Sequence, residues 1–175
     1  MADRNDGALQ AAIKALEHAV LPAVNPADPL AGEQLRLVVG YLKLLRQRLD
    51  YVEDRKRFEL EHYRTLAEAL QDDARTQGGE VAQRFEAALR EVKAAERPCD
   101  VPAATAAVAS AVSGLVRVVA DADPERRRRI EQTVARHSKR WIDAQRAWFA
   151  PLGFELRPEQ LPALADAKQA ARPQA

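Results

Sequence analysis

The sequence has little cysteine and no long apolar run. Cys99 is the sole cysteine among 175 residues, which excludes an intramolecular disulfide and gives no sign of an oxidising compartment. The first ten residues, MADRNDGALQ, lack the basic and apolar regions of a secretory signal. No apolar run approaches the roughly 20 residues that span a bilayer. We therefore expect a cytoplasmic protein with no membrane partner.

Motifs that carry catalysis or bind nucleotides are also missing. The sequence contains no Gly-x-Gly-x-x-Gly stretch and no phosphate-binding loop. Cys99 lies between prolines and has no histidine near it in the sequence, so no activated nucleophile is indicated. We expect a protein that is not an enzyme and that needs no cofactor.

One metal motif is half present. Glu59 and His62 have the Glu-x-x-His spacing of di-iron carboxylate bundles, which need a second such motif and two further glutamates. His18 and His137 have no glutamate three residues earlier, so the second motif is missing. A mononuclear site with one of the preceding acidic residues is an alternative. A surface histidine among charges explains the pattern more simply, and we predict no metal site.

Composition indicates a helical globular protein. Hydrophobic residues make up 47% and charged residues 30% of the chain, and alanine, leucine, arginine and glutamate dominate. We predict an all-α fold, an antiparallel bundle of about five main helices in one domain over residues 1–150. A C-terminal tail, 151–175, follows with a short helix around Glu159 to Gln169.

Proline, glycine and capping residues divide the chain. A first helix is expected after Asp6, which would cap it, with Leu9, Ile13, Leu16, Val20 and Val24 on one buried stripe. The further breaks predicted are NPADPL (25–30), Gly78 with Gly79, RPCDVP (97–102), the capping pair Asp123 and Pro124, and Pro151 with Gly153. The helix expected from about Ala103 to Asp121 is apolar nearly all round, so we place it centrally in the bundle.

The segment 30–77 contains no proline and predicts a long helix. As a single helix it would be about 70 Å long, whereas a compact chain of this size has a radius of gyration of roughly 16 Å. The helix therefore bends near residues 53–59 or packs against a second copy. We predict a homodimer through the heptad residues of this segment, namely Leu35, Val38, Leu42, Leu45, Leu49 and Val52.

Charge is distributed unevenly along the chain. The net charge is +1, but residues 1–123 carry 16 basic and 20 acidic side chains, whereas 124–150 carry 8 and 3. The basic segment opens with the arginine run Arg126, Arg127, Arg128 and Arg129. One reading is a helix that contacts nucleic-acid phosphates. We favour the other, a core helix with one buried stripe whose arginines pair with the acidic stretch from Asp50 to Glu61. That stripe comprises Ile130, Val134, His137, Trp141, Ala144 and Trp148.

Two stretches of the first third carry a resemblance. ALEHAVLPAV, followed by QLRLVVGYLKLLRQRLDYVEDRKRFELEHYRTLAEAL, resembles a group of small helical bacterial proteins of unassigned function. These proteins accompany acyl-CoA dehydrogenase-like and aminoglycoside-phosphotransferase-like proteins. The resemblance covers residues 15–70 and includes no catalytic signature, so it implies a helical bacterial protein but assigns no site residue.

Three hypotheses of function follow. The preferred one is a non-catalytic helical accessory or interaction protein that acts as a homodimer. The first alternative is a small-molecule binder for an acyl-CoA-like ligand, with an apolar pocket near Trp141 and Trp148 and phosphates held by Arg126 to Arg129. The second alternative is a nucleic-acid binder that uses the basic helix 124–150.

Overall fold

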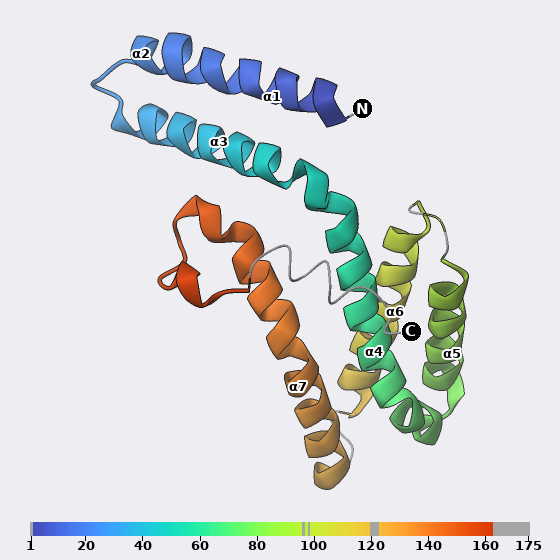
Figure 1. Cartoon of the computed structure of the whole chain (residues 1–175). Coiled ribbons are helices and arrows are strands. Elements are labelled where there is room, and N and C mark those ends of the chain that lie inside the picture. Colours follow the sequence, from blue (N-terminus) through green and yellow to red (C-terminus); the bar gives the residue numbers. More distant parts are fainter. Residues whose placement is uncertain (1, 96, 98, 120–122, 163–175) are drawn as a thin grey trace. The chain divides into compact units, whose positions relative to one another are not determined.

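The computed structural model describes residues 2–95, 97, 99–119 and 123–162 (Figure 1). Helices joined by short turns make up most of this part of the chain, and no strand occurs in it. The all-α fold class predicted from the sequence is therefore confirmed.

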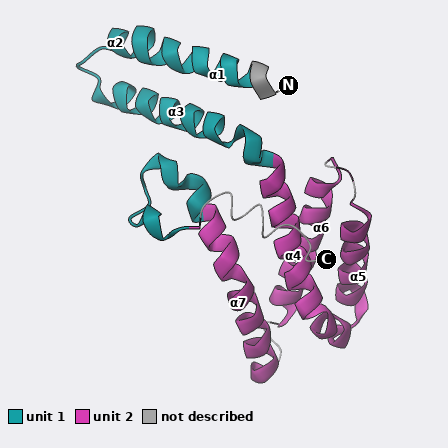
Figure 2. Cartoon of the chain, viewed as in Figure 1, with its two compact units in different colours: residues 1–52, 146–161 teal, residues 53–145, 162–175 magenta. Residues whose placement is uncertain are grey.

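The described residues form two compact units, one from the ranges 2–52 and 146–161 and the other from the range 53–145 (Figure 2). Unit 1 is thus built from two separated stretches of sequence. A compact unit need not be a separately folding domain, so a single domain over 1–150 stays a prediction.

Unit 1 contains a helical hairpin. Its elements are α1 (Ala2–Ala15), a π-helical turn (Leu16–Val20), α2 (Leu21–Ala23) and α3 (Pro29–Arg48). Figure 1 shows α1 and α3 side by side and antiparallel. Two ion pairs join the helices, Arg46 Nε to Asp6 Oδ1 at 2.7 Å and Lys43 Nζ to Glu17 Oε1 at 2.6 Å.

Two details of the first helix differ from the prediction. Asp6 lies inside α1 instead of capping it, and its carboxylate accepts hydrogen bonds from Arg46, which lower the pKa of Asp6. Val20 is 43% exposed and leaves the predicted buried stripe. Val20 is the last residue of the π-helical turn, whose wider turn moves it out of the 3.6-residue register of α1.

The long segment changes helix type at its middle. Asp28 caps α3 by accepting a hydrogen bond from the Ala31 amide at 3.1 Å, and Pro29 occupies the first turn. A 3₁₀ turn, Leu49–Tyr51, then separates α3 from α4 (Val52–Gln77). The irregularity thus falls just before the region 53–59 in which a bend was expected.

Unit 2 has one hydrophobic core shared by four helices. These are α4, α5 (Gly79–Ala94), α6 (Val101–Val118) and α7 (Pro124–Phe149). Its largest fully buried side chains include Leu70 of α4, Phe85 of α5, Leu115 of α6 and Ile130 of α7. Each helix contributes apolar residues at three- and four-residue spacing, and these faces meet in the core.

The predicted breaks in unit 2 coincide with real turns. Gly78 and Gly79 have φ angles of 69° and 56°, a conformation that favours glycine, and they end α4. Asp123 accepts a hydrogen bond from the Arg126 amide at 3.1 Å, with Pro124 as the first residue of α7, as predicted.

By length and composition alone, α6 could cross a membrane, since its mean hydropathy is 1.5 over 18 residues. Core helices of soluble proteins share these properties, and six residues of α6 are buried in unit 2. Val116 and Val118 of the same helix are 37% and 44% exposed, so its central place in the bundle stays a prediction. Its outward side carries Ser110 and Ser113, which are exposed.

The C-terminal segment is short in the described structure. After α7 come a 3₁₀ turn (Ala150–Leu152), Gly153 with a φ of 82°, and a second 3₁₀ turn (Pro158–Gln160). The helix expected around Glu159 to Gln169 falls mostly outside the described residues.

Candidate functional site

A groove of about 420 Å³ lies in unit 2 between α4 and α7. We call it the α4–α7 groove. Its lining residues come from these two helices alone, namely Phe58, Glu61, His62, Thr65 and Ala69 of α4 and Thr133, Arg136, His137 and Arg140 of α7. Their spacing of three and four residues places each set on one helix face, so two regular helices suffice to build the groove.

His62 connects the two helices at the groove. Its imidazole stacks on the indole of Trp141 with ring centroids 5.8 Å apart, and it meets Tyr63 edge-on at 5.0 Å. Burial lowers the pKa of His62 to about 4, with further contributions from His137 and Arg140. At neutral pH the ring is therefore an uncharged aromatic surface.

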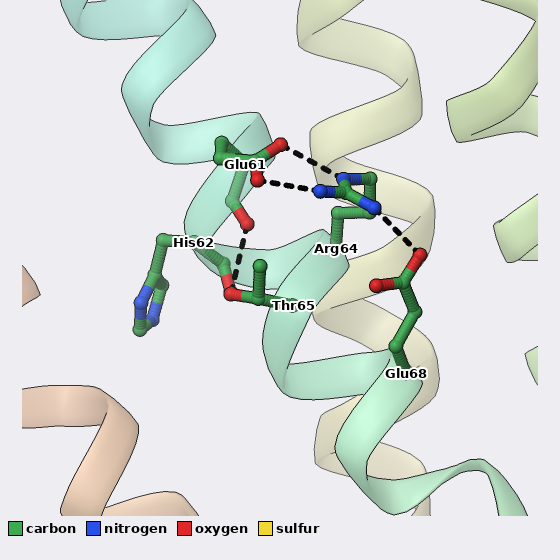
Figure 3. A network of polar contacts seen from close by, with 5 residues as sticks. All are labelled: Glu61, His62, Arg64, Thr65 and Glu68. Atoms are coloured by element: carbon green, nitrogen blue, oxygen red, sulfur yellow. Dashed lines mark hydrogen bonds and ion pairs between the residues drawn. The ribbon is translucent and has the colours of Figure 1, made fainter. Parts of the chain in front are cut away.

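The acidic residue of the groove is already paired. Glu61 accepts two hydrogen bonds from Arg64, from Nη2 at 2.6 Å and from Nε at 2.8 Å. Arg64 also donates to Glu68 at 2.7 Å, and these carboxylates raise the pKa of Arg64. Figure 3 shows this network on α4, with His62 pointing away from it. Thr65 adds a hydrogen bond from its hydroxyl to the Glu61 carbonyl at 3.0 Å.

The α7 side of the groove is basic. The Arg140 guanidinium lies 5.2 Å from the centre of the Phe58 ring, which is a cation–π contact. Arg136 donates a hydrogen bond to the Thr133 hydroxyl at 3.2 Å. His137 Nδ1 lies 2.9 Å from the Thr133 carbonyl oxygen. Because a carbonyl oxygen only accepts hydrogen bonds, Nδ1 is the protonated ring nitrogen and donates this bond. His137 is half-buried and bonded, as expected for a residue of the core stripe.

The two tryptophans predicted to bind a ligand occupy different units. Trp141 packs behind His62 at the groove, and its indole N–H is buried with no acceptor among the described residues. Trp148 belongs to unit 1, where the Arg48 guanidinium lies 5.7 Å from its ring. Arg48 also donates to the backbone carbonyls of Trp148 at 3.2 Å and Ala147 at 3.4 Å. It thereby satisfies carbonyl groups at the C-terminal end of α7.

The arginine run at the start of α7 lies outside the groove lining. Arg129 forms an ion pair with the nearly buried carboxylate of Asp73, and Arg126 donates to the Asp73 carbonyl at 2.7 Å. Arg127 Nε lies 3.9 Å from Glu131. The acidic partner of Arg126 and Arg129 is therefore Asp73, at the end of α4. The stretch from Asp50 to Glu61, which the sequence suggested, was the wrong partner for these two residues.

A second surface lies in unit 1. We call it the α3 face and define it by the exposed apolar side chains of α3, which are Leu30, Leu37, Val38, Tyr41 and Leu45. An open hollow of about 440 Å³ adjoins it, lined by α3 residues together with Pro151, Leu152 and Phe154. Phe154 is 74% exposed. The side chains that α3 buries within the chain are those of Val39, Leu44 and Arg48.

Two of the six heptad residues predicted for a dimer interface are exposed in the chain, and the other four are partly buried within it. Val38 and Leu45 are 48% and 54% exposed, and the other four, Leu35, Leu42, Leu49 and Val52, are partly buried.

The sequence missed Phe58, Arg136 and Arg140 as groove residues. Arg136 and Arg140 are four residues apart, which is a visible signal of a shared face, but the pattern does not reveal which helix that face meets. Among the described residues, no group of three or more His, Cys, Asp or Glu side chains has an arrangement that would hold a metal. Glu59 and His62 thus gain no further ligand there.

No family model, curated protein or solved structure matches the chain. The resemblance over residues 15–70 therefore stays an expectation from the sequence.

Proposed function

We propose that the protein is a helical interaction protein that assembles as a homodimer through the α3 face of unit 1. The observation that carries the proposal is the exposure of Val38, Tyr41 and Leu45, at 48%, 50% and 54%. Fully covering a large apolar side chain contributes about 1.5–3 kcal/mol, so a row of such residues favours association. Soluble monomers rarely expose a contiguous apolar patch of this kind.

The pattern of the exposed residues favours a helical partner. Val38 and Leu45 are seven residues apart, and Tyr41 lies between them at a three- and four-residue step. This spacing places them on one stripe of the helix, which a second helix covers along its length. The adjoining hollow, with Phe154 at its edge, extends the apolar area beyond the helix.

The helix dipole favours a second copy in antiparallel orientation. Two α3 helices that run in opposite directions place the positive end of each dipole beside the negative end of the other. The basic residues Lys43, Arg46 and Arg48 do not set the orientation, because Glu17, Asp6 and the carbonyls of Ala147 and Trp148 already bind them.

The test is the oligomeric state of the purified protein by native mass spectrometry and light scattering. We expect a dimer for the wild type and a monomer for Leu45→Glu, which places a charge on the exposed stripe. Gln47→Glu is the matched control, because it adds the same charge to the same helix at an exposed position off that stripe. Leu42→Glu should dissociate or unfold the protein, since Leu42 is partly buried within its own chain.

A monomeric wild type at concentrations of about 100 μM would refute the proposal, as would a dimer that survives Leu45→Glu unchanged. Circular dichroism of each variant separates dissociation from unfolding. The proposed role is binding and includes no catalytic step, and a location in the cytoplasm stays a prediction with it.

A further inference from the structure

The α4–α7 groove of unit 2 has a chemistry that dimerisation through α3 does not use. Its lining combines apolar side chains on α4 with basic side chains on α7. Its volume of about 420 Å³ falls within the roughly 300–1,000 Å³ typical of small-molecule sites. The question is which chemical class of ligand it accepts.

The charge of the groove favours an anion. Arg136 and Arg140 are exposed on the same face of α7, and among the described residues no carboxylate pairs with either of them. Glu61, the acidic residue of the lining, is held in two hydrogen bonds by Arg64. Guanidinium groups stay charged at all ordinary pH values and bind carboxylate or phosphate oxygens in a fixed planar geometry.

Several arginines elsewhere in the chain pair with a carboxylate, which distinguishes them from the two groove arginines. Arg46 is bonded to Asp6, Arg129 to Asp73 and Arg97 to Asp100. Lys139 lies between Arg136 and Arg140 in the sequence, yet its Nζ is 2.7 Å from Asp143 Oδ2. Within residues 136–140 of α7, the two arginines that line the groove have no carboxylate partner in the described part of the chain, whereas Lys139 between them has one.

The opposite wall favours a planar apolar group. Phe58 and His62 are four residues apart on α4, and both line the groove. The His62 ring is held in place by its stacking on Trp141. Aromatic rings in such positions favour offset or edge-to-face contact with another ring, worth about 0.5–1.5 kcal/mol beyond the buried area. Beside them lies the buried Trp141 N–H, which has no acceptor in the described part of the chain.

We propose that the α4–α7 groove binds a small planar organic anion, with its carboxylate or phosphate between Arg136 and Arg140 and its ring against Phe58 and His62. Carboxylate and phosphate groups both present anionic oxygens that pair with guanidinium groups, so either headgroup fits this position. The ring accounts for the aromatic wall, which a free inorganic anion would leave unused.

The test uses three naphthalene probes that differ in the headgroup. These are 2-naphthoate, 2-naphthyl phosphate and the neutral 2-naphthamide. Binding to the full chain is measured by isothermal titration calorimetry and by the indole N–H signals in ¹⁵N-correlated NMR spectra. Trp148→Phe assigns the remaining indole signal to Trp141, which is the reporter beside the groove.

We expect at least one anionic probe to bind and to shift the Trp141 signal, with the amide at least about tenfold weaker. The tighter of the two anions identifies the headgroup class. Arg136→Gln and Arg140→Gln should each weaken binding about tenfold, the loss of one charge-assisted hydrogen bond. Lys139→Gln is the matched control, because it removes the same charge from the same helix at a position that does not line the groove.

Three results would overturn the inference. They are the absence of binding by either anion at millimolar concentration, equal binding of the amide, and a loss in Lys139→Gln as large as in Arg140→Gln. Both groove arginines are exposed, so their variants should stay folded, and thermal melting of each variant checks this. The comparison of the three probes uses the wild-type protein alone. It does not depend on the oligomeric state, which the α3 variants test separately.

Discussion

The imidazole of His62 stacks on the indole of Trp141 with an angle of 29° between the ring planes and 5.8 Å between the centroids. One ring comes from α4 and the other from α7, so the pair joins the two helices that form the groove. The environment that holds the rings together also keeps the imidazole uncharged. This makes His62 a reporter for the packing of unit 2.

We predict that His62 titrates with a pKa near 4, against about 6.5 in the unfolded chain. As the pH falls from 6.5 to 4, the unfolded chain takes up a proton that the native protein does not. The free energy of unfolding therefore falls over this window, and the contribution of His62 is complete above pH 6.5. Imidazole NMR shifts measure the pKa directly.

Urea unfolding between pH 4 and 7 should show a weaker pH dependence for His62→Gln than for the wild type. A His62 resonance that titrates above pH 6 would contradict the burial of this ring.

Neighbouring residues of α6 test the core of unit 2. Leu115 has no exposed surface, and Val116 beside it is 37% exposed. Leu115→Ala should lower the free energy of unfolding by about 2–5 kcal/mol through lost burial and a cavity. Val116→Ala should cost less than about 1 kcal/mol. Chemical denaturation measures both, and equal losses would mean that α6 does not pack by this face.

Arg48 offers a test of unit 1. It is buried, and burial lowers the pKa of its guanidinium, while its bonds to the carbonyls of Ala147 and Trp148 compensate for the buried charge. Arg48→Met keeps the apolar stem but leaves these carbonyls without their donor, at a cost of about 1–3 kcal/mol. Trp148 fluorescence in a Trp141→Phe background follows the unfolding. Arg36→Met is the control, because Arg36 is exposed. An equal loss of unfolding free energy in both variants would contradict the stabilising role of the Arg48 hydrogen bonds.

The basic character of α7 leads to a prediction about nucleic acid. Arg126, Arg129 and Lys139 have partners within the chain, and so does Arg146, which is bonded to Glu155. Phosphate contacts by such residues would have to break these bonds first. We therefore expect these four residues to contribute little to retention on heparin at about 50 mM salt, and any retention to depend on Arg136 and Arg140 instead. Retention that Arg126→Gln abolishes would instead support the nucleic-acid alternative.

The features that the sequence predicted well are those set by local chemistry. Asp123 with Pro124 marks the start of α7, and Gly78 with Gly79 marks the end of α4, because capping and positive φ angles depend on the residue itself. The core residue Ile130 also followed from helical periodicity. These signals involve residues a few positions apart.

The features that the sequence missed depend on distant partners. Arg129 pairs with Asp73, 56 residues away, and nothing in a helical pattern selects that acid over the others. In α3, Val39 and Leu44 are buried while Val38 and Leu45 are exposed. Apolar residues occupy several sides of this helix. Periodicity therefore predicted that α3 packs against another helix, but it did not show which of its apolar stripes is buried within the chain. The groove was hidden for the same reason, because it exists only where α4 faces α7.

The split composition of unit 1 has a consequence for protein synthesis. Arg48 leaves the ribosome 100 residues before Trp148, a delay of about 5–20 s at roughly 5–20 residues per second. Residues 53–145 of unit 2 form a continuous stretch and are complete before the last part of unit 1 appears. During that delay α3 has emerged without residues 146–161, so Arg48 lacks the carbonyls of Ala147 and Trp148 that bind it in the finished unit.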